Sequence, residues 1–280
     1  MSVARLTILV ENSTHQPGLQ AEHGWSVWIE WGDQAFLFDT GQSGMWLNNA
    51  RQLKVPLSRL GGVMLSHGHY DHTSGLAALG ALAEEMPVYL HPDAFAPKYS
   101  VPAGASPRYI GMPQASRDWL QQQGARVKTV HTALEVAPGL WLSGPIPRQN
   151  TFEDVGGPFY LDAEGRCPDP LWDDMALGMM TREGLVVLLG CAHAGVVNTL
   201  AHFRSLLGSP PVYAVVGGMH LLQASAERLT ATMEALEQYQ VRRLGVGHCT
   251  GFVAAVALSH RFSGRCFVPA AGTRLEFPLP

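Results

Sequence analysis

Three histidines and one aspartate lie within the six residues of the segment HGHYDH, which follows one apolar run and precedes another. His67 and His69 are two residues apart, so in an extended loop both rings point the same way and can bind one metal ion. Asp71 and His72 follow where a helix is expected to begin, at Thr73, so their side chains leave the loop on another side and can bind a second ion. The alternative is an Asp71 that only caps the helix beside surface histidines, but a chance cluster rarely follows a buried strand so directly.

Further metal ligands have to come from other parts of the chain, because a hydrolytic metal site needs three or more protein ligands. Three later segments repeat one pattern: an apolar run, then small residues, then a histidine. Small residues let the backbone approach a crowded centre, so we expect these strand ends to converge. For each histidine alone, a structural role is an equal alternative. The residues are Cys191 and His193 in LVVLLGCAHAG, His220 in VYAVVGGMHLL, and His248 with Cys249 in RRLGVGHCTG.

The elements that position these side chains are predicted by hydrophobic patterning. Segments dense in β-branched, aromatic and leucine residues predict strands, and Gly32-Asp33 between two of them predicts an antiparallel hairpin. The predicted strands are Leu6–Val10, Val27–Trp31, Ala35–Phe38, Gly62–Leu65, Val88–Leu90, Val127–Val130, Leu140–Leu142, Leu185–Leu189, Val212–Val216 and Arg243–Val246. Three apolar stripes predict helices that face the core: Leu229, Met233 and Leu236 after a Ser225 cap; Leu200, Phe203 and Leu207 before Gly208; and Leu76, Leu79 and Leu82.

The length of 280 residues predicts one compact domain over residues 1–280. Two irregular regions rich in proline and glycine, near 92–115 and 143–172, are predicted to be loop insertions. Loops of this length inside a compact domain are usually lids or binding walls.

The composition excludes several classes of partner. Hydrophobic residues make up 46% of the chain and charged residues 15%, so much of it should be interior. The net charge is −4 and the basic residues are scattered, so nucleic acid is not an expected partner. The four cysteines form no CxxC pair, which favours a reducing cytosol, and no apolar run is long enough for a membrane span. We therefore expect a soluble, cytoplasmic protein with a small-molecule substrate; the oligomeric state is not indicated.

HGHYDH resembles the HxHxDH signature of the metallo-β-lactamase superfamily, and LFDTG at Leu37–Gly41 resembles the strand and turn that precede this signature. The resemblance extends over nearly the whole chain. ENS, EHGWSVWIE, SGPIPR, GCAHAGVVNTL, VVGGMHLL and GHCTG closely resemble the branch that includes the dihydropterin-ribofuranosylaminobenzene-phosphate synthase of methanopterin synthesis. The resemblance implies an α/β fold, the four-layer αβ/βα sandwich, in which two mixed β-sheets lie face to face with helices on the outer faces and metals at one edge.

The resemblance also implies a set of metal ligands. Carried over by position, His67 and His69 bind a first ion, and Asp71, His72 and His248 bind a second. The implied cofactor is zinc, as one or two ions, and manganese or iron is also allowed by these ligand types.

Two positions depart from the superfamily pattern. SGPIPR stands where the superfamily usually has a third histidine for the first ion, and Cys191 stands in place of the usual bridging aspartate. We therefore predict that His193 supplies the missing imidazole. Cys191 is either a soft ligand or an inert buried thiol.

The expected chemistry is attack by a metal-activated water on an acyl or phosphoryl group. Besides ligating, Asp71 is predicted to orient this water as a catalytic residue, and His220 either donates a proton to the leaving group or is structural. Arg148 in PIPR presents a planar fork suited to an anionic substrate group, with a solvated loop arginine as the alternative. On the strength of the resemblance, the substrate edge is also expected to include Glu11, Asn12 and His23.

The function predicted from these residues is a metal-dependent hydrolase or transferase. Its substrate is expected to be small and anionic, with a phosphate or ester group, and a pterin-like compound is one candidate. The first alternative is an iron-dependent oxidoreductase or sulfur dioxygenase of the same fold; the di-iron branch typically has glutamate where this chain has His69. The second is a non-catalytic metal-binding protein, although such proteins tend to lose ligands. A nucleic-acid-processing member would be expected to carry a basic surface, which this chain lacks.

Overall fold

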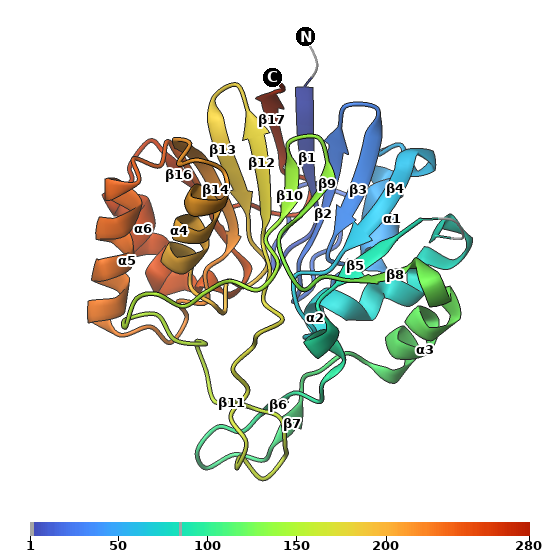
Figure 1. Ribbon diagram of the computed structural model, residues 1–280, viewed down its shortest axis with the longest axis horizontal. Helices are drawn as coiled ribbons and strands as arrows, with labels where there is room; N and C mark the ends of the chain where they lie inside the picture. Colours follow the sequence, from blue (N-terminus) through green and yellow to red (C-terminus); the bar gives the residue numbers. More distant parts are fainter. Residues whose placement is uncertain (1–2, 84–85) are drawn as a thin grey trace. The chain divides into compact units, whose positions relative to one another are not determined.

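The computed structural model describes residues 3–83 and 86–280, and the chain forms two compact units (Figure 1). The first unit comprises Met1–Val130, Pro158–Asp173 and Ala270–Leu279, and the second comprises His131–Gly157 and Asp174–Pro269 with Pro280. Each unit is thus assembled from segments that are distant in the sequence. The expected single domain over residues 1–280 stays a prediction.

The first unit is built on a seven-stranded mixed sheet. Its strands are β1 (Val3–Val10), β2 (Ser26–Trp31), β3 (Gln34–Phe38), β4 (Leu60–Met64), β5 (Val88–Leu90), β8 (Val127–Thr129) and β17 (Arg274–Pro278). They follow the order β17-β1-β2-β3-β4-β5-β8, antiparallel from β17 to β3 and parallel from β3 to β8. The helices of this unit are α1 (Met45–Gln52), α2 (Tyr70–Thr73) and α3 (Gln114–Gln123), with 3-10 turns η1 (Leu57–Arg59), η2 (Ser74–Ala83), η3 (Pro92–Phe95) and η4 (Gly124–Arg126).

The second unit is built on another seven-stranded mixed sheet. Its strands are β9 (Leu134–Ala137), β10 (Leu140–Leu142), β12 (Leu177–Thr181), β13 (Gly184–Leu188), β14 (Val212–Gly218), β15 (Arg243–Gly247) and β16 (Cys266–Phe267). They follow the order β16-β15-β14-β13-β12-β10-β9, parallel from β16 to β13 and antiparallel beyond. The helices of this unit are α4 (Val196–Leu206), α5 (Ala226–Gln238) and α6 (Phe252–Arg261), with the 3-10 turn η5 (His248–Thr250).

Each unit has its own apolar core. In the first, Trp28 and Trp46 are fully buried among the aliphatic residues of β3, β4 and β5. In the second, Phe203 of α4 and Leu258 of α6 pack with the continuous apolar runs of β13 and β14. Strands buried on both faces read as unbroken apolar runs, which explains why the sequence predicted them so readily.

The predicted strands are all present, with ends shifted by a few residues, and β2 and β3 form the expected hairpin at Gly32-Asp33. Ser225 caps α5 as predicted, since its side chain accepts a hydrogen bond from Arg228 N. The stripe from Leu76 to Leu82 was wrong as an α-helix. It forms 3-10 turns interrupted at Gly80, whose φ is 46°, and Leu82 is exposed.

The two regions predicted as loop insertions are only partly irregular. In the first unit they pair as a three-stranded sheet of β6 (Tyr99–Ser100), β7 (Arg108–Tyr109) and β11 (Phe159–Tyr160), in the order β11-β6-β7. Two-residue strands are too short to give a periodic signal, so the sequence did not reveal them. Among the described residues, no helix is both long and apolar enough to cross a membrane.

Candidate metal centre

The HGHYDH segment of the first unit leaves the carboxyl end of β4 and runs directly into α2. The helix begins at Tyr70 rather than at Thr73, so Asp71 and His72 lie in its first turn. His69 occupies the N-cap position without a side-chain capping bond, so Asp71 is not the cap. The segment is held by Tyr70 N, which donates to Ile110 O at 2.9 Å.

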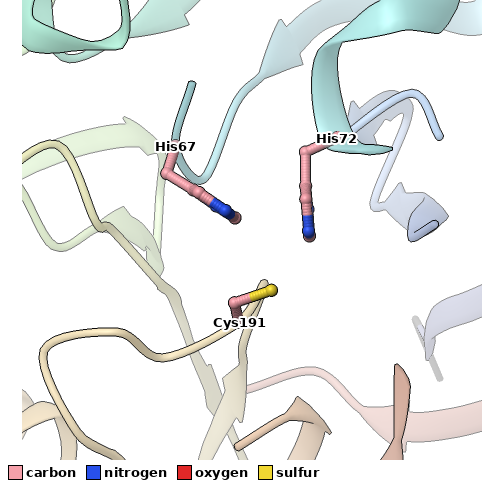
Figure 2. A group of neighbouring side chains, drawn as sticks. All are labelled: His67, His72 and Cys191. Carbon is pink, nitrogen blue, oxygen red and sulfur yellow. The ribbon is translucent and has the colours of Figure 1, made fainter. Parts of the chain in front are cut away.

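The three imidazoles of this segment lie close together. His67 Nε2 is 2.9 Å from His69 Nδ1, and the ring centroids of His67 and His72 are 4.2 Å apart. Figure 2 shows the rings of His67 and His72 pointing into the same space. Asp71 Oδ2 lies 3.6 Å from His72 Nε2 and 3.2 Å from His23 Nε2. The first unit therefore brings together His23 and the four ligands predicted from HGHYDH.

One buried carboxylate, Asp39 at the end of β3, orients two of these rings. It accepts hydrogen bonds at 2.7 Å from Ser66 N, Ser66 Oγ and His72 Nδ1. Because the Ser66 hydroxyl donates to Asp39, its oxygen accepts the Nδ1 proton of His67 at 2.9 Å. Both rings then present Nε2 as the ligating atom, which is the usual arrangement around a metal.

The charges around the segment set the protonation of its histidines. Burial, assisted by the Lys98 charge, lowers the pKa of His69 to about 3, so this ring is neutral and can donate a lone pair. Burial also lowers the pKa of His72, but the charges of Asp39 and Asp71 outweigh it and raise that pKa from its ordinary value. A cation of either kind, proton or metal, is thus favoured beside Asp39 and Asp71.

A second buried carboxylate, Asp173, holds the backbone between His67 and His69. Its Oδ2 accepts from Gly68 N at 2.7 Å, and its Oδ1 pairs with Lys98 Nζ at 2.8 Å. Lys98 also pairs with Asp169 at 3.0 Å. A side chain on Gly68 would place Cβ 2.3 Å from Ala94 O, so only glycine fits there.

The predicted substrate residues of the first unit divide into two kinds. Glu11 accepts from Ser13 N and Ser13 Oγ at 2.7 and 2.8 Å, and Asn12 Oδ1 accepts from Gly24 N at 3.3 Å. These contacts give both residues a role in the turn after β1. His23 instead contacts Asp71, and the hydrogen bond that His23 donates to this carboxylate raises the pKa of His23.

In the second unit, three possible ligands lie at the ends of two parallel strands. One donor atom each of Cys191, His248 and Cys249 lies within 4.8 Å of the other two. Cys191 follows β13, and Figure 2 shows it on that turn. His248 and Cys249 form η5 directly after β15. Cys249 Sγ donates to Cys191 O at 3.6 Å.

His193 and His220 form a second pair in this unit, with ring centroids 4.4 Å apart. His193 Nδ1 donates to Val155 O at 2.8 Å, which leaves Nε2 as its ligating atom. His220 has a φ of 45° and packs on Gly156, where a Cβ would lie 2.1 Å from its Nδ1. The backbone of 155–156 therefore orients both rings.

Two acidic residues fix this backbone segment. Glu153 accepts from Val197 N and Asn198 N at the start of α4, both at 2.9 Å, and Asp154 forms an ion pair with Arg228 of α5. Burial raises the pKa of Glu153 despite these bonds. The predicted anion-binding residue Arg148 lies partly buried in the segment after β10.

These donors fit a divalent metal ion. Ligand nitrogens on one zinc lie roughly 3.3 Å apart, because Zn–N is about 2.0–2.1 Å. The distance of 2.9 Å between His67 Nε2 and His69 Nδ1 is close to this value. Ser66 and Asp39 hold the rings of His67 and His72 through their Nδ1 atoms. Asp39, Asp173, Lys98 and Glu153 were missed from sequence. Only Asp39 carried a signal, as an acidic residue between a strand and a glycine.

The model of the metallo-β-lactamase superfamily matches residues 19–161. The 7,8-dihydropterin-6-methyl-4-(β-D-ribofuranosyl)-aminobenzene-5'-phosphate synthase of Methanocaldococcus jannaschii is 29% identical over an alignment of 247 residues, which covers 84% of this chain and 83% of that protein. An uncharacterised protein of the same organism is 29% identical over 91% of this chain and 93% of its own.

Among solved structures, this chain resembles Tm1679, described as a metal-dependent hydrolase of the β-lactamase superfamily. The TM-score is 0.83 at 31% identity, covering 97% of this chain and 98% of Tm1679. These comparisons confirm the family resemblance and the fold class predicted from the sequence. They do not test the individual site residues, whose roles stay predictions.

Proposed function

Because the chain belongs to the metallo-β-lactamase superfamily, we propose that it is a metal-dependent hydrolase or transferase that acts on a small anionic substrate. The observation that carries this proposal is the set His67, His69 and His72, whose rings converge in the first unit. Asp39 orients two of the rings, and a carboxylate in that position is typical of functional metal sites.

The proposed metal ligands are those predicted from the sequence. His67, His69, Asp71 and His72 provide the donors of the first unit. Cys191, His193 and His248 are the proposed donors of the second unit. Zinc is the ion that this mixture of imidazole, carboxylate and thiol suits best. We propose a content of one or two ions, which elemental analysis distinguishes.

When bound, such an ion supplies a Lewis acid that polarises an acyl or phosphoryl oxygen and lowers the pKa of water. In this proposal Asp71 accepts a hydrogen bond from the attacking water and sets its direction. His220 donates a proton to the leaving group, because an imidazole can carry out this transfer near neutral pH. His23 holds Asp71 in place through the 3.2 Å contact.

The substrate class is proposed from two observations. The name of the archaeal synthase includes a 5'-phosphate and a dihydropterin, so an anionic substrate with a flat ring is a reasonable candidate here. Arg148 is proposed to bind the anionic group through its guanidinium fork. Glu11 and Asn12 are proposed to shape the substrate edge through the turn that they hold.

The test combines elemental analysis with a substrate panel. Protein purified without added metal is analysed for zinc, manganese and iron, and then assayed on phosphodiester, phosphomonoester, lactone and thioester compounds. We expect zinc and activity on one class, and a loss of about 100-fold or more in His72→Ala. His260→Ala, an exposed histidine of α6, is the control and should be unchanged.

Two outcomes would contradict the proposal. Stoichiometric iron with an oxygen-dependent reaction would indicate the oxidoreductase alternative. A folded His67→Ala/His69→Ala variant that loses metal and keeps every measurable function would indicate a non-catalytic protein.

A further inference from the structure

We propose that Cys249 is a metal ligand, and that Cys191, His248 and Cys249 form a thiolate-rich site for zinc or another thiophilic divalent cation. The sequence pattern places Cys249 next to a predicted ligand but assigns it no role. This inference rests on the proposed function in one respect, namely that the protein binds a divalent metal. It goes further by assigning two sulfur donors to the second unit.

The three donors are already grouped within the second unit. One atom each of Cys191, His248 and Cys249 lies within 4.8 Å of the other two. Ligands on one zinc lie roughly 3.5 Å apart, because Zn–S is about 2.3 Å and Zn–N about 2.0 Å. Small rotations of the side chains therefore suffice to bring all three onto one ion. Three protein ligands with an open fourth position are typical of catalytic zinc sites.

Two adjacent residues reach the same ion only because the backbone turns sharply. In an extended strand, His248 and Cys249 would point to opposite faces. Instead the chain leaves β15 through η5, with His248 at a φ of 51°. This turn is fixed by Thr250 Oγ1, which accepts from Met219 N at 3.2 Å. A histidine held in the left-handed region by its surroundings is a feature that clusters at functional sites.

A glycine makes room for the Cys249 sulfur. A Cβ on Gly218, at the end of β14, would lie 2.5 Å from Cys249 Sγ and 2.6 Å from Gly190 O. Gly218 N donates to that same carbonyl at 3.0 Å, so the ends of β13 and β14 are held together beneath the sulfur. The strand ends thus leave a place that the Cys249 side chain occupies beside Cys191.

The chemistry of coordination is simple. Each thiol loses its proton to solvent as its sulfur donates a lone pair to the ion, so binding of one divalent cation by both cysteines releases two protons. No oxidant or reductant takes part. In the alternative role, Cys249 remains a thiol that only donates to Cys191 O.

Cobalt substitution distinguishes the two roles. A cobalt(II) ion bound by thiolates shows a charge-transfer absorption in the near ultraviolet that imidazole and carboxylate ligands do not give. We expect this band in the full protein under reducing conditions. It should fall to about half in Cys249→Ser and in Cys191→Ser, and disappear in the double variant, because each sulfur contributes one ligand. Serine at 249 keeps a hydroxyl donor in place of the thiol.

Cys266→Ser is the matched control, because Cys266 is a partly buried cysteine of the same unit that lies on β16, outside the cluster. Its variant should keep the whole band. Gly218→Ala provides a second test, since its Cβ displaces the Cys249 sulfur without removing a donor. It should weaken the band as Cys249→Ser does. Circular dichroism of each variant checks that it is folded.

A band of equal intensity in the wild-type protein and folded Cys249→Ser would overturn this assignment. So would stoichiometric cobalt without a sulfur band, although the hydrolase proposal would survive because imidazoles would then hold the metal. A wild-type protein that binds no cobalt would contradict both proposals.

Discussion

The two sheets present their polar residues in different ways, although both end in a run of parallel strands. In the first unit, one six-residue segment after β4, HGHYDH, supplies all four predicted ligands. In the second unit, the predicted ligands Cys191, His193 and His248 come from two separate turns, after β13 and after β15. The first arrangement needs buried charges that hold one loop, whereas the second needs unusual backbone conformations at each strand end.

The backbone conformations support this contrast. Ala192, His220 and His248 of the second unit all have positive φ, between 45° and 54°. In the first unit, Asp39 beside the candidate ligands has a φ of 57°, and no residue of the HGHYDH segment itself has a positive φ. Charge and hydrogen bonding therefore position the predicted ligands of the first unit, and local backbone strain positions those of the second unit.

The largest expected effect is on the buried ion pairs of the first unit. Lys98→Met would leave Asp169 and Asp173 buried without their cation, which should cost about 3–5 kcal/mol of unfolding free energy. Chemical denaturation measures this change. Lys54→Met, at an exposed lysine after α1, is the control and should change stability by about 0.5 kcal/mol or less. A Lys98→Met variant with the unfolding free energy of the wild-type protein would contradict the view that buried charge positions the ligands of the first unit.

The same ion pair predicts a pH dependence. Burial opposes ionisation of Asp173, but the Lys98 charge outweighs it, so the pKa of Asp173 is lowered in the folded protein. Its contribution is therefore fully present above the ordinary carboxyl pKa of about 3.9 and is lost as pH falls through the lower folded value. The stability difference between the wild-type protein and Lys98→Met should be constant near neutral pH and shrink in acid. A difference that grows below pH ~4 would be inconsistent with this sign.

The next effect in size concerns Asp39. Asp39→Asn removes the charge that holds Ser66 and His72, so zinc affinity should fall about 10–100-fold, with a loss of about 1–3 kcal/mol in stability. Competition with a chromophoric chelator measures the affinity. Asp33→Asn, in the exposed β2–β3 turn, is the matched control. If both variants bind zinc equally well, Asp39 does not orient the ligands.

Much of this organisation was predictable, and the parts that were not have a common physical reason. Local patterns revealed the strands, the α5 cap and the HGHYDH cluster, because apolar runs and dense imidazoles are visible within a few residues. The partners of that cluster were hidden, because Lys98 and Asp173 are 75 residues apart and each looks like an ordinary surface residue in sequence. The start of α2 at Tyr70 was missed for a related reason. At this position Tyr70 N donates to Ile110 O, a contact of which the sequence gives no sign.

Glu153 provides the counterpart of Asp39 in the second unit. Glu153→Ala removes the acceptor for two backbone N–H groups at the start of α4, so it should cost about 1–2 kcal/mol. The effect of Glu153→Ala on zinc affinity should be smaller than that of Asp39→Asn. Glu153 influences His193 only indirectly, through the backbone of 153–155, where Val155 O accepts from His193 Nδ1. Thermal unfolding and the same competition assay measure both changes. Glu135→Ala, an exposed glutamate of β9, is the control.

The smallest effect on stability is expected at His248, where backbone conformation rather than buried charge is proposed to position a ligand. Asparagine tolerates the left-handed region better than most residues, so His248→Asn should keep the η5 turn and cost about 1 kcal/mol or less, although His248 is buried. The imidazole is lost, however, so cobalt or zinc affinity should fall while the fold stays intact. Valine is β-branched and strongly disfavours a φ of 51°, so His248→Val should lose both stability and metal affinity. If His248→Asn and His248→Val are equally stable, backbone conformation does not constrain this strand end, and the distinction between the two sheets fails at that point.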